Sequence, residues 1–168
     1  MPDGEEVDAI ANMNATTGYA RPESLAEPEW LWQHRDDPTV RTIDRGDPAG
    51  YARAHIPGAG RLLRGEAAGT VPQDWLKDRD DPLHVMMPDA FAESMARCGV
   101  SDGTTVVAHD DGNGTAATRL WWVLGFYGHP GVRVLNGGWQ RWVDESQPIA
   151  IRETTPERGP SLPPLTTD

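Results

Sequence analysis

The sequence predicts an α/β domain: a short, mostly parallel central sheet of about five strands, covered by helices on both faces. Apolar runs typical of strands alternate with segments of helical periodicity through the middle of the chain. Turns rich in glycine and proline separate these segments. The clearest single unit, residues 104–142, has the order strand, tight loop, helix, strand, which is a parallel crossover.

The first half of the chain supplies short elements. Pro28 suits the first turn of a helix, because its fixed φ is already helical. In chain order we expect a helix over 29–34 that buries Trp30, Leu31 or Trp32, a strand over 40–43 that ends at Asp44, a helical turn over 51–54, and a fixed loop over 55–59 with the sequence HIPGA.

The second half supplies longer elements. A helix is expected to begin at Pro88 and to end at Gly99, since glycine readily adopts the left-handed conformation that closes a helix. The elements after it are a strand over 106–108, a loop over 110–114, a helix from Thr115, a strand over 132–135, and a closing helix that follows Gly137 and Gly138 and carries Trp139 and Trp142.

Composition narrows the class of protein. A chain of 168 residues suits one domain with tails. We place a flexible N-terminal tail at 1–20, the domain at 21–150, and a proline-rich tail or interdomain linker at 151–168. The net charge of −11 disfavours nucleic acid and anionic membrane as partners. No apolar run is long enough to span a bilayer, and the acidic N-terminus is unlike a signal peptide, so we expect a cytoplasmic protein.

Residues 110–115 form the candidate site, because a loop at a helix N-terminus directs unpaired N–H groups toward an anion. Its members are Asp110, Asp111, Gly112, Asn113, Gly114 and Thr115. The run from Gly112 to Ala117 satisfies the dinucleotide pattern G-x-G-x-x-A. However, Asn136 stands where the ribose-binding acid should end the next strand, which argues against a nucleotide.

Three other interpretations of this loop remain. A calcium loop would need glycine and glutamate at positions occupied by Ala116 and Trp122. A phosphate-accepting Asp110 would need a second acidic motif for Mg²⁺, and none follows a later strand. The simplest interpretation is structural: Asp110 or Asp111 accepts backbone N–H groups at the start of the helix. We expect no metal and no cofactor.

Four motifs in order resemble the rhodanese-homology domain of thiosulfate and mercaptopyruvate sulfurtransferases, and they cover about residues 28–145. They are VRTIDR at 40–45, YARAHIPGA at 51–59, GVSDGTTVVAHDD at 99–111 and LWWVLGFYGHPGVRVLNGGWQRW at 120–142. The resemblance implies that a cysteine should follow the strand ending at His109 and carry a persulfide. Asp110 occupies that position here, and a carboxylate cannot form a persulfide by this chemistry.

The substitution is similar to the non-catalytic N-terminal half of tandem sulfurtransferases, which implies a silent structural or regulatory domain. The implied partner is a catalytic rhodanese domain, in tandem or separate, or a second copy of the chain. Two alternatives stay open. An active sulfurtransferase could use a partner's thiol or Cys98, the single cysteine. The chain could instead be a module that binds a small anion, including a sulfur-containing one, or a protein.

Other residues carry weaker signals. Cys98 lies in the last turn of a helix, on its apolar face, where a buried structural thiol is expected. Asp44 and Arg45 end a strand, and His55 lies in the HIPGA loop; we expect these three to anchor loops at the edge of the site. Trp121, Trp122, Trp139 and Trp142 are expected to fill the core or a domain interface.

Overall fold

The computed structural model describes residues 18–62, 67–68, 71–72, 76–78, 81 and 84–152. The expected tails lie almost wholly outside these ranges, so the predicted domain boundaries stay predictions. No helix in the described part of the chain is long and apolar enough to cross a membrane.

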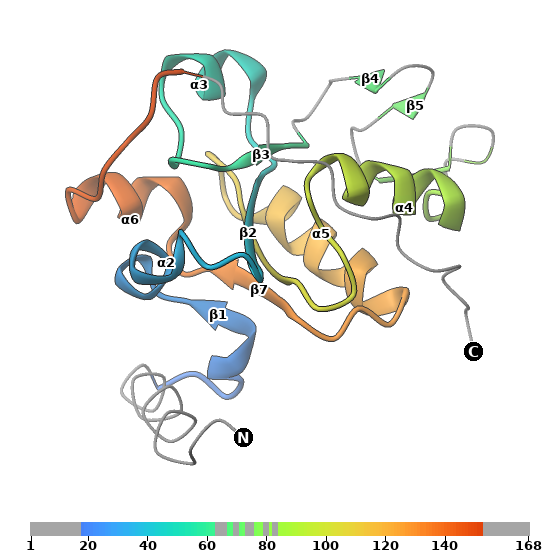
Figure 1. The fold of residues 1–168 in the computed structure, drawn as a ribbon, viewed down its shortest axis with the longest axis horizontal. Coiled ribbons are helices and arrows are strands. Elements are labelled where there is room, and N and C mark those ends of the chain that lie inside the picture. Colours follow the sequence, from blue (N-terminus) through green and yellow to red (C-terminus); the bar gives the residue numbers. More distant parts are fainter. Residues whose placement is uncertain are drawn as a thin grey trace.

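Helices and strands alternate along the described chain, as predicted (Figure 1). The helical elements are η1 Pro22–Ser24, α2 Pro28–His34, α3 Pro48–Arg53, α4 Pro88–Arg97, α5 Thr115–Phe126 and α6 Gly138–Asp144. The strands are β1 Leu25–Ala26, β2 Val40–Asp44, β3 Gly60–Arg61, β4 Ala67–Ala68, β5 Val71–Pro72, β6 Thr105–His109 and β7 Val132–Leu135.

The main sheet has five strands in the order β1-β7-β6-β2-β3, and every neighbouring pair is parallel. The longest pairing joins β2 to β6, from Val40 opposite Thr105 to Asp44 opposite His109. The carboxyl ends of these two strands are therefore level, which brings the residues that follow them together. The predicted fold class is confirmed.

Two apolar clusters pack against the two faces of the sheet, with α4 and α5 on one side and α2, α3 and α6 on the other. Figure 1 shows these two groups of helices on opposite sides of β2. Alternate residues of β6 point to opposite faces, so Val106 and Ala108 enter the α4–α5 cluster while Val107 enters the other. Both faces are covered, as is typical of a parallel sheet.

Helix α3 begins earlier than the predicted turn over 51–54. Pro48 stands in its first turn, and the Asp47 carboxylate accepts the N–H of Gly50 at 3.0 Å. A proline preceded by an aspartate N-cap is a strong start signal, which the apolar pattern alone does not include. The two-residue strands β1, β3, β4 and β5 were not predicted either, because two residues carry no periodicity.

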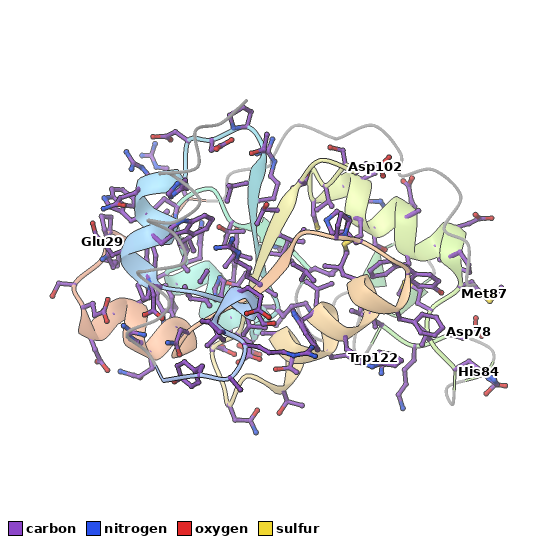
Figure 2. The ribbon with its side chains drawn as sticks, turned by 90° about the horizontal axis from the view of Figure 1, so that it is seen from below. Glu29, Asp78, His84, Met87, Asp102 and Trp122 are labelled. Atoms are coloured by element: carbon purple, nitrogen blue, oxygen red, sulfur yellow. The ribbon has the colours of Figure 1, made fainter. Side chains whose placement is uncertain are left out.

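The tryptophans differ in burial. Trp142 is fully buried, Trp121 and Trp139 are half-buried, and Trp122 is 44% exposed. The prediction of a core position is therefore wrong for Trp122, because α5 faces the sheet with Leu120, Leu124 and two alanines instead. Figure 2 places Trp122 on the side of the strands away from Glu29 of α2. A role in a domain interface stays a prediction.

Candidate functional site

The loop from Asp110 to Gly114 connects β6 to α5 at the carboxyl end of the sheet. The helix can begin at Thr115 because Gly114 adopts φ +84°, a left-handed conformation that side chains disfavour. This geometry points the N–H groups of the loop and of the first helical turn inward. Such a cradle favours negative charge.

The carboxylate of Asp110 fills this cradle. Its Oδ1 accepts the N–H groups of Gly112 and Gly114, both at 3.0 Å, and its Oδ2 accepts that of Ala117 at 2.9 Å. The residue is only 4% exposed. These contacts match the structural interpretation, in which the carboxylate accepts unpaired backbone N–H groups at the start of the helix. These three donors are therefore occupied from within and are not available to an external anion.

The other loop residues do not converge on a common point. The Oδ2 of Asp111 accepts the N–H of Asp47 at 3.1 Å, which ties the loop to the start of α3. The Oδ1 of Asn113 accepts from Thr115, from its N–H at 3.2 Å and from its hydroxyl at 2.6 Å. Asp111 therefore binds a distant segment and Asn113 stabilises the loop itself, so these side chains do not point at one shared ligand position.

A cavity of about 310 Å³ lies beside this loop, between it and the start of α6. Its wall is formed by Leu25, His109, Asp110, Gly112, Asn113, Gly114, Ala117, Val134, Leu135, Asn136, Gly137 and Gly138. Of these residues, only His109 can become positively charged. No arginine or lysine of the described chain lines this cavity, so it offers little to a doubly charged anion.

Asp44 and Arg45 lie where the sequence predicted, at the end of β2. The Oδ1 of Asp44 accepts the N–H of Gly46 at 2.7 Å, and its Oδ2 lies 3.5 Å from Nε2 of His109. Arg45 is fully buried, and its Nη1 donates to the carbonyl of Leu62. Arg45 therefore holds the chain that follows β3 and does not line the cavity beside the loop.

His55 fixes the HIPGA loop. Its Nδ1 donates to the carbonyl of Tyr51 at 2.8 Å, and the two rings stack with centroids 3.8 Å apart. Its backbone pairs with Ala150 through two hydrogen bonds of 2.9 and 2.8 Å. Both contacts anchor the loop, and the side chain is buried.

The single thiol lies away from the cradle. Cys98 follows the last turn of α4, and its Sγ donates weakly to the carbonyl of Arg61 on β3, at 3.6 Å. Strand β2 separates β3 from β6, whose end carries Asp110. Burial raises the pKa of the Cys98 thiol to about 12, although Arg45 and Arg97 oppose the shift. A thiol with this pKa is protonated at neutral pH and is a weak nucleophile.

The comparisons with known proteins agree with this architecture. A family model described as a rhodanese-like domain matches residues 27–145. The chain belongs to the rhodanese-like domain family. It is 36% identical over 150 residues to the sulfur carrier protein TtuD of Thermus thermophilus, which covers 88% of this chain and 47% of that one.

Other members of the rhodanese family give the same result. The 3-mercaptopyruvate sulfurtransferase of Escherichia coli is 36% identical over 126 residues, which cover 67% of this chain and 42% of the relative. The crystal structure of SseA from Escherichia coli superposes with a TM-score of 0.69 and 25% identity, covering 85% of this chain and 56% of that one. The chain spans about half the length of the curated relatives it matches.

Two features of this rhodanese-like domain were missed from the sequence. One is the pairing of Asp44 with His109, which are 65 positions apart and meet only because β2 and β6 are in register. The other is a second cavity on the far side of His109, lined also by Trp139. The pairing of Asp44 with His109 could have been expected, because each of them ends an apolar strand. Residues that end adjacent parallel strands are neighbours.

Proposed function

We propose that this rhodanese-like domain does not carry sulfur itself and acts as the structural or regulatory companion of a catalytic rhodanese domain. The observation that supports this most directly is the carboxylate of Asp110, held by three backbone N–H groups at the position where the resemblance implies a persulfide-forming cysteine. The proposal includes a cytoplasmic location.

The chemistry of sulfur transfer explains why the substitution matters. A thiolate attacks the outer sulfur of thiosulfate, a new S–S bond forms, and sulfite leaves with the electrons of the broken bond. A carboxylate oxygen is a poor nucleophile toward sulfur, and its product would have no stable S–S bond. The charge of Asp110 would also repel an anionic donor from the only N–H cradle of the described loop.

Cys98 offers no substitute for the missing thiolate. It is 2% exposed, it lies against β3, and burial raises its pKa to about 12. A reactive thiol needs a lowered pKa and access to the donor, and Cys98 has neither. The alternative in which Cys98 forms the persulfide is therefore disfavoured, whereas a thiol on a partner domain stays compatible with the proposal.

The length of the curated relatives supports a companion domain. The curated relatives TtuD and 3-mercaptopyruvate sulfurtransferase are about twice as long as the part that this chain matches. The chain matches only one rhodanese-like unit, over 27–145. A second unit, on the same or another polypeptide, would supply the persulfide in this proposal.

The test is transfer of sulfur from thiosulfate to cyanide, measured as thiocyanate, for the purified chain and two variants. We expect the unmodified chain and Cys98→Ser to give background rates. Asp110→Cys should stay well below a catalytic rhodanese assayed beside it, because among the described residues no arginine or lysine lines the cavity at the loop. Turnover by the unmodified chain that disappears in Cys98→Ser would contradict the proposal.

A further inference from the structure

A cavity of about 300 Å³ lies between α2, the first half of β2 and the HIPGA loop, on the face of the sheet that α2, α3 and α6 cover. It shares no lining residue with the two cavities beside His109, and the proposed function uses none of its residues. Three other cavities in the described chain each have at least one carboxylate in the wall. The wall of this one holds two arginines, Arg35 and Arg41, and no acidic residue.

Arg41 lies at the free edge of β2. Strand β3 pairs only with Ile43 and Asp44, so among the described strands the start of β2 has a neighbour on one side only. The Arg41 side chain folds back along this edge, and its Nη1 donates to the carbonyl of Val40 at 2.8 Å. Its Nε is buried and makes no hydrogen bond with the described residues. The guanidinium therefore has donors to spare, and its partly buried position strengthens its attraction for an anion.

Arg35 holds the second positive charge in place. Its Nη1 donates to the carbonyl of Trp32 at 2.7 Å, and its guanidinium carbon lies 3.8 Å from the centroid of the Trp32 ring. Its ion pair is with Asp36, at 3.1 Å, whose side chain is 83% exposed. An ion pair this exposed is worth little, so an anion in the cavity can bind Arg35 without breaking a buried pair.

The acidic residues that follow α2 do not neutralise the cavity from within. Asp36 and Asp37 come directly after the helix, and neither lines the cavity. The Oδ1 of Asp37 accepts the N–H and the hydroxyl of Thr39, both at 2.7 Å, so it stabilises the turn before β2. The cavity is therefore locally positive on a chain whose net charge is −11.

The rest of the wall is mainly apolar. Leu31, Val40, Ile56 and Trp142 line the cavity, and all four are buried. Thr42, which is also buried, adds one hydroxyl that can donate or accept a hydrogen bond. A wall divided in this way fits a ligand that has an apolar body and one anionic end.

We propose that this cavity binds a small organic monoanion, a carboxylate joined by a short chain to one aromatic ring. The carboxylate lies between the guanidinium groups of Arg35 and Arg41, because their planar donors match carboxylate oxygens. The ring lies against the apolar wall, where the Trp142 indole is an aromatic partner. The volume is at the lower end of the range of about 300–1,000 Å³ for small-molecule pockets, which favours a single ring. This site is independent of sulfur transfer.

The test is isothermal titration of the full chain with 3-phenylpropionate. 3-Phenylpropan-1-ol supplies the ring without the charge, and acetate supplies the carboxylate without the ring. We expect saturable binding of 3-phenylpropionate, and affinities at least about tenfold weaker for the other two compounds. Arg35→Gln and Arg41→Gln should each weaken 3-phenylpropionate by about tenfold or more. Both variants should bind the alcohol as the unmodified chain does, which shows that the cavity is still formed.

The matched control is Arg53→Gln, because Arg53 lines a different cavity and its replacement should leave the binding of 3-phenylpropionate unchanged. Should Arg41→Gln fail to fold, Arg35→Gln still tests the proposal, because the Arg35 side chain is 37% exposed. Absence of saturable binding up to the solubility limit of 3-phenylpropionate would overturn the proposal. So would equal affinity for the alcohol, or an unchanged affinity for 3-phenylpropionate in Arg35→Gln. None of these outcomes bears on the thiocyanate assay, so this inference and the proposed function fail separately.

Discussion

Asp110 accepts three backbone N–H groups with its two oxygens, while its neighbour Asp111 accepts one from Asp47. From the sequence, either aspartate could have capped the start of α5. The choice between them depends on which side chain faces the loop interior, and this is fixed by the direction in which β6 ends. The sequence therefore predicts a carboxylate cap at the start of α5, but not which of the two aspartates provides it.

Removing the Asp110 carboxylate should destabilise the fold. Asp110→Ala leaves three donors without their acceptor, and we expect the free energy of unfolding to fall by about 2–4 kcal/mol. Asp110→Asn keeps one oxygen for Gly112 and Gly114 and should cost less. Urea denaturation measures both.

Asp111→Asn is the control for this series, because Asp111 is exposed and accepts one N–H, from Asp47, where Asp110 accepts three, so the change should cost less than about 1 kcal/mol. An Asp110→Ala variant as stable as this control would show that the loop does not depend on the carboxylate.

Cys98 should make the stability sensitive to alkaline pH. Its pKa is raised from 9.0 to about 12 by burial, so above pH 9 the unfolded chain releases a proton that the folded chain retains. The stabilising contribution is complete below pH 9 and is lost as pH rises toward 12. Cys98→Ala removes this effect. The stability difference between the two proteins should change in favour of Cys98→Ala by about 1 kcal/mol between pH 9 and pH 10.

Urea denaturation of both proteins across this pH range measures the change. Tyr127, whose pKa burial also raises, is present in both proteins, so its effect cancels in the comparison. Parallel pH profiles for the two proteins would contradict burial as the cause of the raised Cys98 pKa.

At the scale of elements, the crossover β6–α5–β7 was predicted almost residue by residue. Its apolar periodicity and the glycines between its elements indicate the same boundaries. Helix α5 begins at Thr115 and β7 spans Val132–Leu135, as expected. The two-residue strands β1 and β3 escaped prediction, since tertiary pairing with β7 and β2 defines them. Local pattern suffices for long elements and fails for short ones.

The start of α6 should be intolerant of a side chain. Gly138 has φ +59°, and a Cβ there would lie 3.2 Å from the carbonyl oxygen of Asp110. Gly138→Ala should therefore lower the free energy of unfolding by about 1–2 kcal/mol, through backbone strain and displacement of the Asp110 loop.

Gly103→Ala is the matched control for Gly138→Ala, because nothing lies within 4 Å of its Cβ position and its φ is not positive. Thermal denaturation of both variants should show a loss only for Gly138→Ala. Equal losses would indicate a general cost of replacing loop glycines.

At the scale of the whole molecule, four motifs in order predicted the family, and the family model and the fold agree with them. The same sequence could not predict the cavity between Asp44, His109 and Trp139, because it forms only when the ends of two strands and a helix meet. Nor could it predict the exposure of Trp122, which depends on how α5 is rotated against the sheet. Features of the function that the family does not specify depend on how tertiary structure places side chains that are distant in the sequence.

The central claim is that the chain holds a carboxylate where sulfur transfer requires a thiolate. The most direct test is the intact mass of the folded chain after incubation with excess thiosulfate. We predict an unchanged mass. A gain equal to one sulfur atom, removed again by cyanide, would show that the chain forms a persulfide and would contradict the account.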